Sequence, residues 1–116
     1  MPVNEEGIVK ADDFLDAITK DTILITLMTA NNESGALQPV KEVGEICREK
    51  GILFHTDAAQ AAGKVSITLD DSGIGNGVDM VTIVGHKVCQ HFRSLTFFGL
   101  LNACCFLNVK DWCPQR

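Results

Sequence analysis

The chain has 116 residues, which suits one modest domain and is too short for two. Hydrophobic residues make up 46% of it and charged residues 22%, a composition that excludes a disordered or fibrous chain. The net charge is −5 and Lys and Arg form no cluster, so we expect no nucleic-acid partner. The acidic N-terminus has no apolar core, so we expect no signal peptide.

The first part of the chain predicts a helix, a strand and a second helix. Residues 11–18 begin with acidic residues and carry apolar residues at helical spacing, which favours a short helix. Residues 22–29 are a continuous apolar and β-branched run, which predicts a strand buried on both faces, as in parallel sheets. After a polar loop at 31–35, we expect a helix over 39–50, with Gly51 as its stop.

Two more strands follow in the predicted order of elements. Residues 52–56 predict a second buried strand that ends at Asp57, and a stretch of small residues at 58–63 comes next. Residues 78–84 predict the third strand. This alternation indicates an α/β fold with a mostly parallel sheet and flanking helices, in which the loops after the strands share one edge.

Polar side chains follow all three predicted strands, and ligands of open α/β sheets bind beyond the carboxyl ends of the strands. These residues are Asn31 and Asn32, Asp57 and Gln60, and His86 and Lys87. A lysine in this position can form a Schiff base with pyridoxal phosphate, and a carboxylate can pair with the pyridinium nitrogen of that cofactor. Small residues such as Ala58, Ala59 and Gly85 would allow the backbone to approach the cofactor ring.

Three motifs carry these residues. They are Thr29-Ala30-Asn31-Asn32-Glu33-Ser34-Gly35, His55-Thr56-Asp57-Ala58-Ala59-Gln60 with Gly63-Lys64, and Thr82-Ile83-Val84-Gly85-His86-Lys87. In this order and spacing they resemble the cysteine desulfurase and selenocysteine lyase family, which are fold-type I pyridoxal-phosphate enzymes of the class V aminotransferase group. The resemblance runs from about Val3 to Lys87 and implies part of the large domain of a pyridoxal-phosphate transferase.

The resemblance implies a role for each matching residue. Lys87 would hold pyridoxal phosphate and move the Cα proton of the substrate, and Asp57 would pair with the pyridine nitrogen. Gln60 and Asn32 would hydrogen-bond to the ring hydroxyl, and His86 would help to hold the phosphate. In this family the amino-acid substrate leaves as alanine after losing selenium or sulfur.

Val84 stands where many desulfurases carry Ser, which favours a selenocysteine lyase acting on selenocysteine. The alternative is a cysteine desulfurase that supplies sulfur from cysteine for iron–sulfur clusters or thio-cofactors. An alternative of another class is a non-catalytic fragment that pairs with full-length subunits, because large domains of this family form homodimers.

The chain departs from the family after Lys87, where Val88-Cys89-Gln90-His91-Phe92-Arg93 replaces a Gly-Pro-rich turn. Residues 1–87 carry 14 acidic and 7 basic side chains, whereas residues 88–116 carry 1 and 3. We therefore expect residues 1–87 to be a fragment of the large domain and 88–116 to be a divergent, Cys-rich, irregular tail. The family's N-terminal phosphate-binding segment and its later loop with a catalytic cysteine are missing, so we expect this chain to be inactive alone.

Some of these residues also have simpler structural interpretations. Asp57 can cap a following helix, and Asn31 can make a turn. His55 is expected to pack in the sheet rather than bind a ligand, and Cys47 is expected in the core on a helix face.

The tail predicts neither a metal site nor a membrane span. Its Cys and His residues lack the paired spacing of structural zinc sites, so no metal is expected. The apolar run at 95–107 is shorter than the ~20 residues that cross a bilayer, and we expect an exposed segment or a helix there. With no signal peptide, the cysteines are expected to be reduced thiols in the cytosol.

Overall fold

The structure is a computed structural model that describes residues 1–67, 77–84 and 104–108. Its elements, in chain order, are α1 (Ala11–Ala17), β1 (Leu24–Met28), α2 (Val40–Lys50), β2 (Leu53–Asp57), β3 (Met80–Val84) and β4 (Cys104–Asn108). Both predicted helices and all three predicted strands are present, each within a few residues of its expected bounds. The α/β fold class is therefore confirmed.

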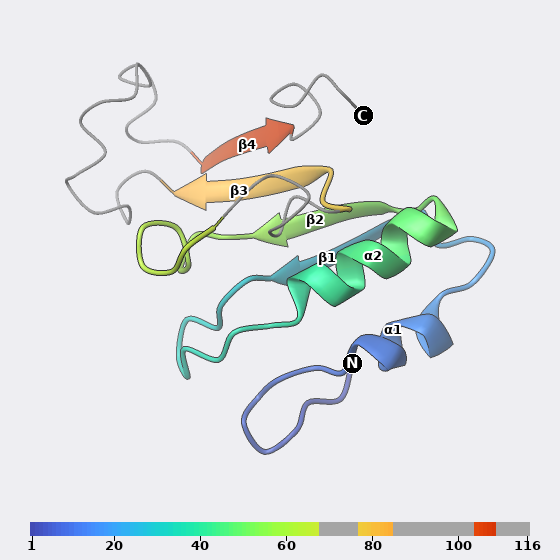
Figure 1. The fold of residues 1–116 in the computed structure, drawn as a ribbon, viewed down its shortest axis with the longest axis horizontal. Helices are drawn as coiled ribbons and strands as arrows, with labels where there is room; N and C mark the ends of the chain where they lie inside the picture. Colours follow the sequence, from blue (N-terminus) through green and yellow to red (C-terminus); the bar gives the residue numbers. More distant parts are fainter. Residues whose placement is uncertain (68–76, 85–103, 109–116) are drawn as a thin grey trace.

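The strands form one sheet in the order β1-β2-β3-β4. The β1–β2 and β2–β3 pairs are parallel, and Met28 and Thr82 both lie opposite Asp57 at the carboxyl end of β2. In Figure 1 the three parallel arrows point the same way, and the loops that follow β1 and β2 leave from the same end of the sheet. This arrangement places the polar loops along one edge, as the strand order predicted.

Helix α2 has clear signals at both of its ends. Pro39 is the N-cap residue, where its missing N–H costs no helical hydrogen bond. Gly51 ends the helix in the left-handed conformation with a φ of 68°, which glycine adopts without strain. Val43 and Cys47 are completely buried on the apolar face of the helix, so the prediction of Cys47 as a core residue is confirmed.

Strands β1 and β2 have buried side chains on one face of the sheet only. The face under α2 carries Ile25, Phe54 and Val81, which belong to the hydrophobic core. We call the opposite face of the sheet the second face, and it carries the alternate residues Leu24, Thr26, Met28, Leu53, His55, Asp57, Met80, Thr82 and Val84. The side chains of Leu24 and Leu53 are 45% and 47% exposed there. The expectation of strands buried on both faces is thus wrong for β1 and β2, because α1 and α2 pack against one side.

The tail differs from the irregular segment that the sequence predicted. Residues Cys104–Asn108 form β4, which pairs antiparallel with the whole length of β3. Residues 104–107 are the last four of the apolar run 95–107, and there a strand replaces the expected helix. The expected exposure of this run stays a prediction. The rest of that run and the other tail residues lie outside the described residues.

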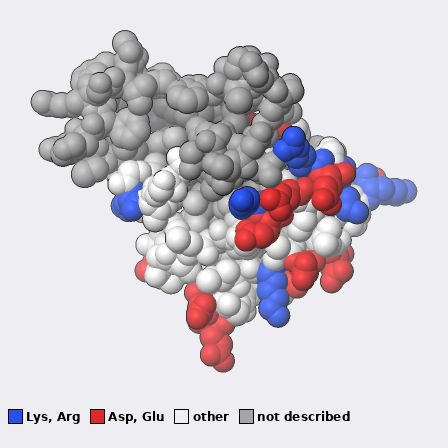
Figure 2. Space-filling model, in the orientation of Figure 1, with Lys and Arg blue, Asp and Glu red and all other residues white. Residues whose placement is uncertain are grey.

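Charged side chains cover the helical side of the molecule. On the described surface visible in Figure 2, acidic and basic side chains alternate and do not separate into a basic patch. Within the described residues, no helix combines the length and the apolar character needed to cross a membrane.

Candidate functional site

Asp57 lies at the carboxyl end of β2, at the edge where the sequence predicted a binding site. Its side chain is exposed, and its Oδ1 accepts a hydrogen bond of 2.8 Å from the backbone N–H of Ala59. From the described residues, no hydrogen bond reaches Oδ2. The chain after Asp57 forms turns rather than the helix expected there, so Asp57 caps a turn. The carboxylate is therefore oriented through Oδ1, and Oδ2 can accept a hydrogen bond from a ligand.

Four alanines follow Asp57 and are buried. They are Ala58, Ala59, Ala61 and Ala62. The N–H of Ala58 donates to the carbonyl of Thr82 at 2.9 Å, which ties this turn to β3. Their burial packs the turn against the rest of the molecule and so fixes the backbone that follows Asp57.

The loop after β1 is organised by Asn31. Its side-chain Oδ1 accepts hydrogen bonds from the N–H groups of Glu33 at 2.8 Å and Ser34 at 3.0 Å. Its backbone N–H donates to the carbonyl of Ala36 at 2.9 Å. This confirms the turn-forming interpretation of Asn31. Asn32 is the next residue on the same loop, and its side chain is exposed and available to a ligand.

Gln38 anchors this loop to the N-terminal segment, a role that the sequence analysis missed. Its Oε1 accepts from the N–H of Val9 at 3.1 Å, and its Nε2 donates to the carbonyl of Gly7 at 2.9 Å. Its backbone N–H donates to the carbonyl of Thr29 at 3.0 Å. The two side-chain bonds join residues that are 29 and 31 positions apart in the sequence, so no local sequence pattern indicates them.

The remaining predicted residues are placed in part. Gln60 is half-buried in the turn after Asp57, and its Oε1 accepts from Lys64 Nζ at 3.2 Å. Lys64 belongs to the second of the three sequence motifs. His86 and Lys87 lie outside the described residues, three residues or fewer beyond the end of β3 at Val84. The structure thus brings Asp57 and Gln60 together after β2 and sets Asn32 on the loop after neighbouring β1.

His55 lies on the second face of the sheet, two residues before Asp57. Its Nδ1 is 2.7 Å from Thr26 Oγ1 on β1, and its Nε2 is 2.8 Å from Thr82 Oγ1 on β3. The imidazole is half-buried and packs within the sheet, as the sequence analysis expected. The two hydrogen bonds across neighbouring strands were not expected.

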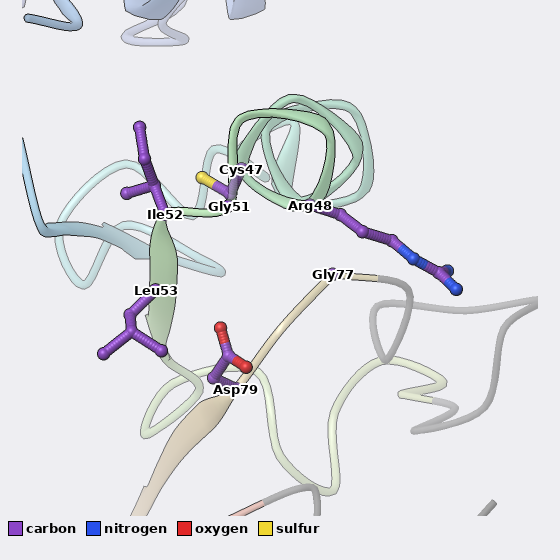
Figure 3. A pocket seen from close by; sticks show the side chains of 7 residues that line it. All are labelled: Cys47, Arg48, Gly51, Ile52, Leu53, Gly77 and Asp79. Carbon is purple, nitrogen blue, oxygen red and sulfur yellow. The ribbon is translucent and has the colours of Figure 1, made fainter. Parts of the chain in front are cut away.

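A cavity of about 260 Å³ lies at the opposite end of the strands, away from Asp57 (Figure 3). Its lining residues are Cys47, Arg48, Gly51, Ile52, Leu53, Gly77 and Asp79. Burial and the nearby Asp79 carboxylate raise the pKa of the Cys47 thiol to about 11. This thiol is therefore protonated and unreactive at neutral pH. Among the described residues, no cluster of His, Cys, Asp and Glu could hold a metal ion.

A family model for aminotransferase class-V proteins matches residues 1–90, which is most of the chain. The chain belongs to the class-V aminotransferase family. It is 50% identical over 88 residues to a mitochondrial cysteine desulfurase of Candida maltosa, covering 76% of this chain and 17% of that protein. It is 49% identical over 87 residues to the cysteine desulfurase IscS of Clostridium botulinum, covering 75% of this chain and 21% of that protein. The chain therefore spans about one fifth of the length of these curated relatives.

Solved structures agree with this family. A NifS-like protein superposes with a TM-score of 0.66 at 36% identity, covering 74% of this chain and 23% of that one. The structure of SspA in complex with cysteine gives a TM-score of 0.65 at 36% identity, covering 73% and 23%. The family is therefore one of pyridoxal-phosphate-dependent enzymes, as the three motifs predicted.

The relatives favour the alternative interpretation of the sequence. Both are named cysteine desulfurases, whereas Val84 had favoured a selenocysteine lyase. One of the two is named mitochondrial, so the cytosolic location stays a prediction. The division of the chain after Lys87 and the homodimer also stay predictions.

The described residues of this class-V family member fit pyridoxal phosphate. Asp57 offers an oriented carboxylate whose second oxygen can accept a hydrogen bond from the N–H of a pyridinium ring. The exposed amide of Asn32 and the Nε2 group of Gln60 can donate to a ring hydroxyl from the two neighbouring loops.

Proposed function

We propose that this chain is the cofactor-binding segment of a pyridoxal-phosphate-dependent cysteine desulfurase. The observation that carries the proposal is the position of Asp57, oriented by Ala59 at the carboxyl end of β2 and followed by buried alanines. The curated relatives named above support cysteine rather than selenocysteine as the substrate. A structural neighbour that was solved with cysteine gives the same support.

Each residue of the proposed site has a role that follows from the chemistry of its side chain. Bound pyridoxal phosphate supplies an electron sink for bond breaking at the substrate. Asp57 holds a proton on the pyridine nitrogen through an ionic hydrogen bond. Asn32 and Gln60 bind the ring hydroxyl, and His86 binds the phosphate. Lys87 provides the amine that attaches the cofactor covalently and then moves the Cα proton of cysteine.

The residues named above supply only part of a complete desulfurase site, so we expect this chain alone to show no desulfurase activity. Losing one preorganised contact can slow an enzyme by about 10²-fold or more. Cofactor attachment is a less demanding property, because it needs the lysine amine and the groups that hold the ring.

Attachment to Lys87 tests the proposal. The full chain is incubated with pyridoxal phosphate, reduced with borohydride and digested, and the modified peptides are mapped by mass spectrometry. We expect the modification on Lys87, with loss of that peptide signal in Lys87→Arg. Lys41→Arg is the matched control, because Lys41 is exposed on α2 and its substitution should leave the Lys87 signal unchanged. Modification spread evenly over the surface lysines would contradict the proposal.

A second candidate function is a non-catalytic fragment that pairs with a full-length homodimer subunit. The exposed side chains of Leu24, Met28 and Leu53 on the second face favour it, because apolar side chains gathered on a strand face are typical of surfaces that another chain covers. Co-purification with a full-length cysteine desulfurase would support this function. Loss of that co-purification in Leu53→Lys would assign it to the second face, and a chain that never co-purifies would contradict it.

A further inference from the structure

The hydrogen bonds of His55 connect three parallel strands at the level just below the candidate site. Thr26 on β1 and Thr82 on β3 contact the two ring nitrogens at 2.7 Å and 2.8 Å. Both distances are short for bonds between nitrogen and oxygen. A neutral imidazole donates from one nitrogen and accepts at the other, and a threonine hydroxyl can do either, so both bonds form with either tautomer.

The register shows why the link to Thr82 matters for Asp57. On β3 the residue opposite His55 is Met80, whereas the residue opposite Asp57 is Thr82. The imidazole therefore reaches diagonally toward the carboxyl end, to the strand position that faces Asp57. The carbonyl of the same Thr82 accepts the N–H of Ala58 at 2.9 Å. The residues before and after Asp57 that are bonded to Thr82 are thus His55, through the Thr82 hydroxyl, and Ala58, through the Thr82 carbonyl.

Backbone hydrogen bonds tie the end of β2 to both neighbouring strands, because the N–H of Ala58 donates to the carbonyl of Thr82 at 2.9 Å and the N–H of Thr29 donates to the carbonyl of Asp57 at 2.8 Å. The side chain of Asp57 itself is exposed. The bond of His55 adds a side-chain link from the middle of β2 to the buried Thr82 in the middle of β3. The bond to Thr26 fixes β1 on the other side in the same way.

We propose that His55 is a positioning residue for the cofactor carboxylate, and that it acts through Thr82 to hold the end of β2 against β3 at the spacing that Asp57 needs. The part of this inference that concerns pyridoxal phosphate rests on the proposed function. The part that concerns strand spacing stands on the hydrogen bonds alone.

Two substitutions of His55 separate the two bonds. Glutamine places its amide near Nε2 and can keep the bond to Thr82, whereas asparagine places its amide near Nδ1 and can keep only the bond to Thr26. A second matched pair is Thr82→Ser, which keeps the hydroxyl, and Thr82→Val, which removes it while keeping the shape. If His55→Asn fails to fold, the Thr82 pair carries the test.

The first measurement needs no cofactor. Amide hydrogen exchange is recorded on the full chain for Ala58 and Ala59, and for Val43 in α2 as a distant core control. We expect exchange at Ala58 and Ala59 to be about fivefold to tenfold faster in His55→Asn and Thr82→Val, the effect of one lost hydrogen bond. His55→Gln and Thr82→Ser should exchange like the wild type. Equal acceleration at Val43 and Ala58, or no difference between Gln and Asn, would overturn the inference.

The second measurement is the dissociation constant of pyridoxal phosphate for the same variants. We expect a rise of about fivefold to tenfold in His55→Asn and Thr82→Val, and values within about twofold of the wild type in His55→Gln and Thr82→Ser. If the wild-type chain takes up no cofactor, the proposed function fails and the exchange pattern still decides whether His55 sets the strand spacing. Unchanged affinity in His55→Asn, with a wild type that binds, would overturn the positioning role.

Discussion

Gly77 lies directly against the backbone carbonyl of Gly44 in α2, and a Cβ atom added to Gly77 would overlap that carbonyl. Gly77 also has a φ of +87°, a conformation that side chains rarely allow. Two independent constraints therefore require glycine where the chain passes α2 before entering β3. This close approach brings β3 into the sheet beside β2.

The substitution Gly77→Ala should destabilise the chain by about 2–4 kcal/mol, from left-handed backbone strain and overlap together. Gly51→Ala is the matched control, because Gly51 has a φ of +68° and a Cβ there would have no atom within 4 Å. Gly51→Ala should lower the free energy of unfolding by about 1 kcal/mol. Urea unfolding of the three proteins measures both values, and equal costs would show that the contact with Gly44 contributes nothing.

The Cys47 thiol should make the protein less stable at alkaline pH. Its pKa in the folded chain is raised to about 11, above the ordinary thiol pKa of 9.0 that applies to an unfolded chain. Between pH 9 and pH 11 the unfolded chain loses this proton first, so the free energy of unfolding falls as pH rises, by at most about 1.4 kcal/mol per pH unit. Below pH 9 the thiol is protonated in both states, so its full contribution to the free energy of unfolding is present.

Cys47→Ala removes this titration and is the direct comparison. The variant should be less stable than the wild type at neutral pH because it loses core packing, and the gap should narrow above pH 9. Urea unfolding from pH 7 to pH 10.5 measures the gap. A gap that stays constant would show that the thiol titrates normally in the folded chain.

Neighbouring asparagines on the loop after β1 should separate stability from binding. Asn31→Ala removes the two bonds to the Glu33 and Ser34 amides and should cost about 1 kcal/mol of stability. Asn32→Ala changes an exposed side chain and should leave the free energy of unfolding within about 0.5 kcal/mol. It should weaken pyridoxal-phosphate binding instead. Loss of stability in Asn32→Ala without loss of binding would reverse this assignment.

Thr29 and Thr56 form a buried hydroxyl pair at 2.9 Å. Because Thr56 donates its single proton to the carbonyl of Leu27 at 2.9 Å, Thr29 is the donor to Thr56. Thr56→Val should lower the free energy of unfolding by about 2 kcal/mol, because it removes both bonds and leaves the Thr29 hydroxyl without this acceptor. Thr29→Val should lower it by about 1 kcal/mol. The double variant should cost less than the two single costs added together. Additive costs in a double-mutant cycle would show that the hydroxyls are not coupled.

Local patterns in the sequence were sufficient for the elements and their order. Pro39 and Gly51 mark the ends of α2 because their backbone preferences act within a few residues. The end of β2 at Asp57 follows from the change from large residues to the small residues after Asp57. The exposure of Leu24 and Leu53 could not be predicted, because burial of a strand face depends on which other segments pack against it.

Contacts between distant residues account for what the sequence analysis missed. The pairing of β4 with β3 joins segments 20 or more residues apart and was hidden by the irregular composition of the tail. The bonds of His55 to Thr26 and Thr82, and those of Gln38 to the N-terminal segment, likewise depend on register and chain path. A useful signal was available for His55, since it occupies the same face of β2 as Asp57.

The protonation of the cofactor nitrogen tests the role of Asp57 most directly. The full chain and its Asp57→Asn variant are loaded with pyridoxal phosphate labelled with ¹⁵N in the ring, with Asp16→Asn as a control for an exposed carboxylate on α1. We expect the ¹⁵N chemical shift of a protonated pyridinium in the wild type and in Asp16→Asn, and that of a neutral pyridine in Asp57→Asn. A neutral ring in the wild-type protein, or a protonated ring that persists in Asp57→Asn, would contradict it.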